Sequence, residues 1–219
     1  MGRSNFLRVV ACAIMLVDHL GAFIFPHVLE FRLIGRSAFP IFAYLIAEGY
    51  FYTRDLSAYF SRLVILASFW QVFHLLFIYL GDFPSVYPFN VIYTLLYGLF
   101  LIVLFERYSF VFFFFAVFFA LLLDFISFGF EYGAYGSLLV LCSHVFRGRY
   151  CILFFAWLLL SALVVSAVLL PWIQLFSVMA VFLLILPFSV SWSFGRFFYW
   201  FYPLHILVLL FVRRVVVLL

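Results

Sequence analysis

Long, nearly unbroken apolar runs are the feature that most limits what this chain can become. Of its 219 residues, 70% are hydrophobic and only 9% are charged, and the mean hydropathy is +1.33. Soluble domains are about half apolar, so this chain lacks the polar residues that a surface facing water requires. Apolar runs of helix length, separated by short loops, predict an all-α, polytopic integral membrane helical bundle.

We expect eight or nine membrane-spanning helices. The runs cover residues 6–25, 37–52, 58–80, 89–105, 109–126, 132–146, 150–170, 172–188 and 197–213. The number becomes eight if one of the weaker segments is a broken or re-entrant helix. The runs do not alternate polar and apolar residues, which excludes the strands of an outer-membrane barrel. No linker or soluble segment interrupts the series, so we expect residues 1–219 to form a single domain.

The arginines predict the orientation, because the chain contains no lysine. Eight arginines open the first run or lie at the loops after even-numbered runs: Arg3, Arg8, Arg54, Arg62, Arg107, Arg147, Arg149 and Arg196. The four on the opposite side are Arg32, Arg36, Arg213 and Arg214. Loops rich in arginine stay in the cytoplasm, so we expect a cytoplasmic N-terminus. The net charge of +4 reflects this bias and is no argument for binding nucleic acid.

Asp18 and His19 stand side by side inside the first apolar run. An ionised carboxylate at the centre of a membrane helix costs roughly 2.5–3.5 kcal/mol on insertion scales, so intramembrane titratable groups point to function. Neighbouring side chains on a helix diverge by about 100°, so these two are poorly placed to bond each other. We expect Asp18 to pair with Arg36 instead. A chemical or transport role is the first hypothesis for the pair, and a structural polar contact between helices is the alternative.

Helix geometry predicts the depth of His19. Arg8 and His19 are close to three turns apart and therefore share a face of the helix. From Asn5 to His19 the helix rises about 21 Å at 1.5 Å per residue. This rise places the imidazole roughly two-thirds of the way across a hydrocarbon core of ~30 Å.

Other polar residues lie within or beside the later runs. His205 follows Pro203 in a segment that we expect to be kinked, and Asn90 opens the fourth run. Glu48 either pairs with Arg54 or faces a substrate. The sequence contains no His-x-x-x-His, Cys-x-x-Cys or Glu-x-x-His spacing, so we predict no metal site.

Several short segments carry a resemblance to a known family. They are NFLR at residues 5–8, MLVDHLG at 15–21, RLIGRSAFPIFAYLIAEGY at 32–50, NVI at 90–92, EYG at 131–133 and YPLH at 202–205. In this order they resemble the TraX family, which is associated with F-pilin acetylation, and the segment at 32–50 is the most specific. Glu131 stands where the family has an aspartate, and Gln71 lacks the proline that tends to follow it.

The TraX family in turn resembles a broader superfamily of multi-helix membrane acyltransferases. That superfamily carries an arginine and a histidine on the first helix and a late histidine, which Arg8, His19 and His205 match. The resemblance implies transfer of an acetyl group from cytoplasmic acetyl-CoA across the bacterial inner membrane. The acceptor that it implies is the N-terminal amine of pilin.

The residue chemistry is compatible with this reaction. A neutral imidazole suits the base that an attacking amine needs, so the predicted catalytic residues are His19, Asp18 and His205. The predicted residues for binding acetyl-CoA are Arg8, Arg36, Arg54, Glu48 and Asn90. Arginines bind phosphates well, so Arg62, Arg147, Arg149 and Arg196 are further anchors to consider.

Two other functions use the same polar residues. A transporter of protons or small solutes also needs intramembrane carboxylates and histidines. No inverted repeat is visible in the sequence, which argues against a transporter. The third hypothesis is a membrane subunit of a conjugation or secretion apparatus without enzymatic activity.

Overall fold

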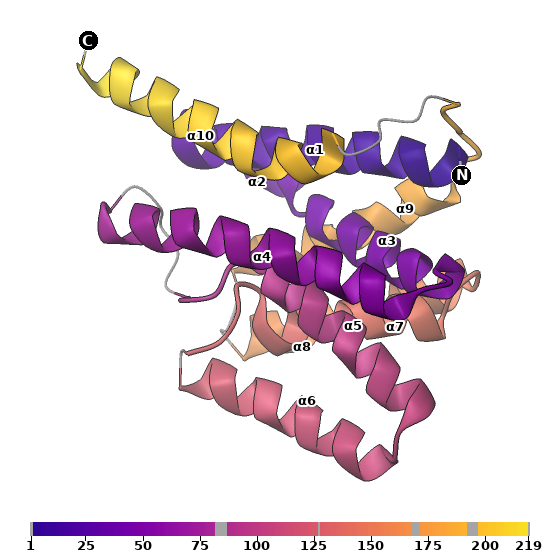
Figure 1. Ribbon diagram of the computed structural model, residues 1–219. Coiled ribbons are helices and arrows are strands. Elements are labelled where there is room, and N and C mark those ends of the chain that lie inside the picture. Colours follow the sequence, from indigo (N-terminus) through magenta and orange to yellow (C-terminus); the bar gives the residue numbers. More distant parts are fainter. Residues whose placement is uncertain (1, 82–86, 127, 168–170, 192–196, 219) are drawn as a thin grey trace. The chain divides into compact units, whose positions relative to one another are not determined.

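The computed structural model describes residues 2–81, 87–126, 128–167, 171–191 and 197–218 (Figure 1). These residues form helices throughout, and no strand is assigned among them. The helices are α1 (Gly2–Phe23), α2 (Leu29–Gly35), α3 (Ala38–Tyr52), α4 (Leu56–Tyr79), α5 (Val91–Arg107), α6 (Phe110–Phe125), α7 (Gly133–Val145), α8 (Tyr150–Ser166), the 3-10 helix η1 (Trp172–Met179), α9 (Ala180–Ile185) and α10 (Phe197–Leu218). The predicted all-α class is confirmed for the described residues.

The chain divides into two compact units. Unit 1 consists of Met1–Leu45 and Gly148–Leu219, and unit 2 consists of Ile46–Arg147. Helix α3 therefore begins in unit 1 and ends in unit 2. The single domain expected for residues 1–219 stays a prediction.

Every predicted apolar run contains a described helix, and the run at 172–188 is broken into η1 and α9. Two of the described helices, α1 and α4, are long and apolar enough to cross a membrane. The number of spans stays a prediction. Helix α2 was expected to be loop, because a helix of seven residues leaves too short a pattern to recognise.

Short polar residues begin three of the helices. The side chains of Asp55, Asn90 and Ser109 accept hydrogen bonds from backbone N–H groups in the first turns of α4, α5 and α6. Such caps satisfy donors that have no partner inside the helix. These three helices therefore start where a polar residue is followed by an apolar run.

Unit 2 is built around α5, which packs against α4, α6 and α7. Leu99 and Ile102 of α5 and Leu139 of α7 are fully buried. A Cβ atom at Gly98 would overlap the side chain of Val140. The absence of a side chain at Gly98 therefore lets α5 and α7 approach closely.

The chain around the start of α5 meets the residues that precede α7. The backbone N–H of Glu131 donates to the carbonyl of Phe89 at 3.0 Å, and the hydroxyl of Thr94 donates to the carbonyl of Glu131. Nδ2 of Asn90 donates to Oε1 of Gln71 at 2.9 Å. These contacts join the starts of α5 and α7 to α4.

Unit 1 contains both ends of the chain, and α1 packs against α2 and α10. The N–H of Val190, ahead of α10, donates to the carbonyl of Gly2 at 3.0 Å, and His19 meets His205 further along. Helices α1 and α10 therefore run in the same direction, as Figure 1 shows in indigo and yellow. Trp157 of α8 is fully buried, and α8 packs against η1 and α9.

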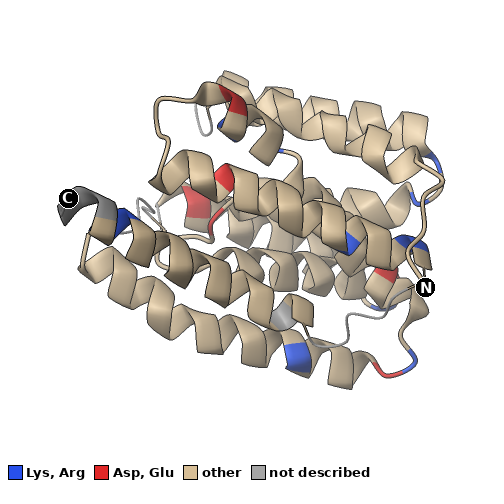
Figure 2. Ribbon diagram, turned by 90° about the horizontal axis from the view of Figure 1, so that it is seen from above, with Lys and Arg blue, Asp and Glu red and all other residues tan. Residues whose placement is uncertain are grey.

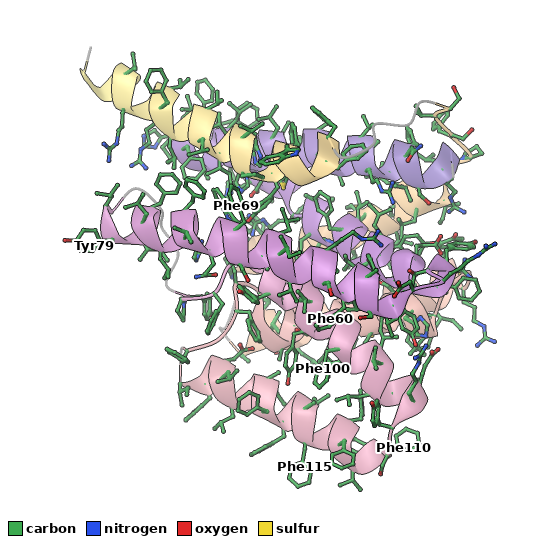
Figure 3. All side chains as sticks on the ribbon, in the orientation of Figure 1. Phe60, Phe69, Tyr79, Phe100, Phe110 and Phe115 are labelled. Carbon is green, nitrogen blue, oxygen red and sulfur yellow. The ribbon has the colours of Figure 1, made fainter. Side chains whose placement is uncertain are left out.

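The surfaces of the helices carry few charges and many aromatic rings. Figure 2 shows that charged residues occupy only isolated positions on the ribbon. On α6, Phe110 is 62% exposed and Phe115 is 67% exposed. Phe115 points away from α5 (Figure 3). Unit 2 thus presents a phenylalanine-rich face to its surroundings.

Candidate active site

Two histidines from opposite ends of the chain meet in unit 1. Nδ1 of His19, on α1, lies 2.7 Å from Nε2 of His205, on α10. The two ring centroids are 4.9 Å apart. His205 is buried and His19 is half-buried. The sequence predicted a role for each residue but did not predict their contact.

The hydrogen-bond partners of His205 determine where the hydrogens lie. Nδ1 of His205 is 2.8 Å from the carbonyl oxygen of Phe201, which can only accept, so Nδ1 donates. The other nitrogen of a neutral imidazole is an acceptor, so Nδ1–H of His19 donates to Nε2 of His205. Nε2 of His19 keeps its lone pair, and none of the described residues donates to it. The pair therefore presents a proton acceptor at Nε2 of His19.

The local sequence around His205 holds its ring in place. The ring of Phe201 stacks on that of His205 with centroids 4.9 Å apart and planes 11° from parallel. Pro203 lies inside α10, where it has no backbone N–H to donate, and the expected kink stays a prediction. The imidazole is thus fixed by one stacking contact and one carbonyl in addition to His19.

Asp18 is bound by two arginines. Nη2 of Arg36 donates to Oδ1 at 2.9 Å and to Oδ2 at 3.1 Å. Nη1 of Arg32 donates to Oδ2 at 2.7 Å. Asp18 and Arg36 are 8% and 7% exposed, so their ion pair is buried. The predicted pairing of Asp18 with Arg36 is confirmed. Arg32 was not predicted as a partner, because it lies on the unrecognised helix α2.

Gly35 makes this cluster possible. A Cβ atom at Gly35 would overlap the side chain of Asp18, so α1 and α2 come this close only because the position has no side chain. Arg32 and Arg36 are one helical turn apart and therefore reach toward the same carboxylate.

A family model described as TraX protein matches residues 3–213, which is nearly the whole chain. The chain belongs to the TraX family. Comparisons with curated proteins and with solved structures give no match. In this TraX chain, the contacts of His19 with His205 and of Asp18 with Arg36 join three of the segments that resemble the family.

The predicted acetyl-CoA-binding residues of the TraX chain have different local roles. Arg8 is exposed and donates to Oδ1 of Asn5 at 3.2 Å. Arg54 is exposed beyond the end of α3. Asn90 is fully buried and caps α5, while its Nδ2 donates to the carbonyl of Ala67 at 3.0 Å. Contact of these residues with acetyl-CoA stays a prediction.

Of the further arginines considered as anchors, Arg62 and Arg149 are exposed, and Arg147 lies at the end of unit 2. Arg196 lies outside the described residues.

Of the two alternatives for Glu48, pairing with Arg54 is wrong, because the structure gives Glu48 another arginine as its partner. Oε1 of Glu48 accepts from Nε of Arg147 at 2.5 Å. Nη2 of Arg147 also donates to the hydroxyl of Tyr52 at 2.8 Å, and its guanidinium lies 3.7 Å from the centroid of the Phe51 ring. Residues of α3 thus surround Arg147, a partner that is remote in sequence and invisible to local spacing.

Replacing Glu48 by glutamine is expected to lower the free energy of unfolding by about 1.5–3 kcal/mol, the usual contribution of a hydrogen bond to a charged group. Thermal unfolding in detergent measures the loss. The matched variant Arg54→Gln should change stability by less than about 0.5 kcal/mol, because Arg54 is exposed. Equal effects of the two substitutions would contradict the assignment of Arg147 as the partner.

A second histidine contact lies in unit 2. Nε2 of His144 is 2.7 Å from Oε1 of Glu106, and the hydroxyl of Tyr50 donates to Oε2 of Glu106 at 2.6 Å. Sequence reasoning did not single out Glu106, because it adjoins Arg107 at a helix end. Within the described part of the chain, no group of three His, Cys, Asp or Glu side chains is arranged to hold a metal ion.

Proposed function

We propose that this TraX chain is a polytopic membrane acyltransferase of the bacterial inner membrane. It moves an acetyl group from cytoplasmic acetyl-CoA to an acceptor amine at the outer side, and the family resemblance implies the N-terminal amine of pilin. The observation that carries this proposal is the pair of His19 and His205 in a chain of this family, because the pair leaves one imidazole nitrogen unprotonated.

The reaction needs a base at the acceptor. The amine nitrogen attacks the thioester carbonyl carbon, and Nε2 of His19 takes the proton that the amine loses. The C–N bond forms, the C–S bond breaks, and the proton passes from His19 to the departing CoA thiolate. His205 accepts a hydrogen bond from Nδ1–H of His19, so it orients the ring and stabilises the imidazolium that forms.

The exposed surface of α6 supports a membrane location. Large apolar patches on a protein surface mark contacts with lipid or with other proteins. The exposed large apolar residues of this helix are Phe110, Val111, Phe112, Phe114, Phe115, Phe118, Phe119, Leu121, Leu122 and Phe125. Such a helix would be poorly soluble in water and is well suited to face lipid.

The parallel arrangement of α1 and α10 favours nine spans over eight. If both helices cross the membrane in the same direction, the total number of crossings is odd. The C-terminal Arg213 and Arg214 then lie on the outer side, opposite the cytoplasmic N-terminus that the other arginines predict.

Arg8 is the residue best suited to anchor acetyl-CoA in unit 1. It lies on the same helix as His19 and nearer the predicted cytoplasmic end, and its guanidinium is exposed. Guanidinium groups bind phosphate through paired, charge-assisted hydrogen bonds. The pantetheine arm of the donor would then extend from the cytoplasmic side toward His19.

Turnover of radiolabelled acetyl-CoA tests the proposed function. The purified chain in lipid nanodiscs is given labelled acetyl-CoA and a peptide with a free N-terminal amine, and CoA release and label on the peptide are measured. Release of CoA that requires the peptide amine supports an acyltransferase. A folded protein that neither binds nor consumes acetyl-CoA contradicts it and favours transport or a structural role in a conjugation apparatus.

A further inference from the structure

The cluster around Asp18 contains more positive than negative charge. One carboxylate contacts two guanidinium groups, so the three side chains together carry one net positive charge. Arg36 is buried against Asp18, whereas 29% of the Arg32 side chain is exposed. A charge in a poorly solvated place is normally balanced by an opposite charge. The excess charge therefore points to an anionic group that binds at Arg32.

Arg32 has hydrogen-bond donors to spare. Nη1 is directed at Asp18, at 2.7 Å from Oδ2 and 3.1 Å from the carbonyl oxygen. Its Nε and Nη2 have no hydrogen-bond partner among the residues that the structure describes. A guanidinium has five N–H donors in a planar fork. Asp18 thus accepts hydrogen bonds from Nη1 of Arg32 and leaves Nε and Nη2 available for a ligand.

Arg32 also lies near the proposed base. Nη1 of Arg32 contacts both the carboxylate and the backbone carbonyl oxygen of Asp18, the residue that immediately precedes His19 on α1. Positive charge here favours a negative charge that develops beside His19.

We propose that Arg32 is a catalytic residue that binds the oxyanion of the acetyl group during transfer. This proposal rests on the proposed acyltransferase function. When the amine nitrogen bonds to the carbonyl carbon, the electron pair of the C=O bond moves onto oxygen, while His19 takes the proton from nitrogen. Nε and Nη2 of Arg32 donate to this oxygen. When the C=O bond re-forms, the C–S bond breaks, and the CoA thiolate takes the proton from His19.

Steady-state kinetics of Arg32→Gln tests the assignment. Loss of one oxyanion donor lowers kcat by about 10²–10³-fold, and we expect this loss with KM for acetyl-CoA close to its wild-type value. Arg32→Lys keeps the charge and should retain a higher kcat than the glutamine variant. Glu30→Gln, an exposed position on the same short helix, is the matched control and should keep wild-type kcat.

Each outcome of this experiment has a definite reading. If wild-type protein turns over acetyl-CoA and Arg32→Gln has unchanged kcat, the oxyanion role is overturned and the acyltransferase function stands. A rise in KM alone also overturns it, because Arg32 would then bind the donor in its ground state. If Arg32→Gln does not fold, Arg32→Lys decides: a lowered kcat with unchanged KM supports the role, and wild-type kcat overturns it. Wild-type protein without any turnover overturns both proposals.

Discussion

Replacing His19 by alanine is expected to lower the rate of acetyl transfer by about 10²–10⁴-fold, the usual contribution of a general base. The substitution removes Nε2, the unprotonated nitrogen that the hydrogen-bond chain from Phe201 through His205 leaves available. Membrane insertion should be unaffected, because alanine is less costly than histidine in an apolar helix. Release of CoA from labelled acetyl-CoA in nanodiscs, with the amount of inserted protein measured in parallel, gives the comparison.

Two further histidine variants separate chemistry from a general effect on the fold. His27→Ala changes an exposed residue in the loop between α1 and α2, and it should retain wild-type turnover. His205→Ala should lose less activity than His19→Ala, because it removes the group that orients the base and leaves the base itself. Wild-type turnover by a correctly folded His19→Ala protein would refute the assignment of His19 as the base.

Replacing Asp18 by asparagine should lower the free energy of unfolding by about 3–5 kcal/mol, because removing one partner of a buried ion pair leaves the other charge without compensation. Arg36 is 7% exposed and has Asp18 as a carboxylate partner. Asparagine has nearly the same shape as aspartate, so the close contact with Gly35 is retained and the change isolates the charge. Thermal unfolding in detergent measures the loss.

A double variant tests the origin of this loss. Arg36→Met in the Asp18→Asn background removes the uncompensated buried charge and should recover part of the stability. Glu30→Gln provides the control, since Glu30 is exposed on α2 and should change stability by less than about 0.5 kcal/mol. Unfolding of Asp18→Asn at the wild-type temperature would show that the cluster does not stabilise unit 1.

The helices could be predicted from the sequence because the signal that specifies them is local. Long apolar runs bounded by residues such as Asp55, Asn90 and Ser109 marked the segments that form helices, and each of these three residues caps one. Helix α2 was missed, since its seven residues are shaped by packing of Gly35 and Phe31 on α1. A short helix of this kind depends more on its neighbour than on its own sequence.

The residues of the candidate site could be predicted from the sequence, but only some of the contacts between them could. His19, His205 and Asp18 stood out because titratable groups are costly and rare in apolar runs. The pairing of Asp18 with Arg36 followed because few charges lie near that depth. Arg32 was not predicted as a second partner because α2 was not recognised, and the partner of Glu48 was not predicted because Arg147 is remote in sequence.

By itself, the sequence determined the all-α class, the positions of the long helices and the polar residues that the proposed chemistry uses. These follow from composition and short-range spacing, which act within one helix. Tertiary structure alone decided that His19 donates to His205, that two arginines share Asp18, and that Arg147 binds Glu48. Each of these contacts requires a donor and an acceptor atom to lie about 3 Å apart. Helix packing sets that distance, because the two residues are far apart in the chain.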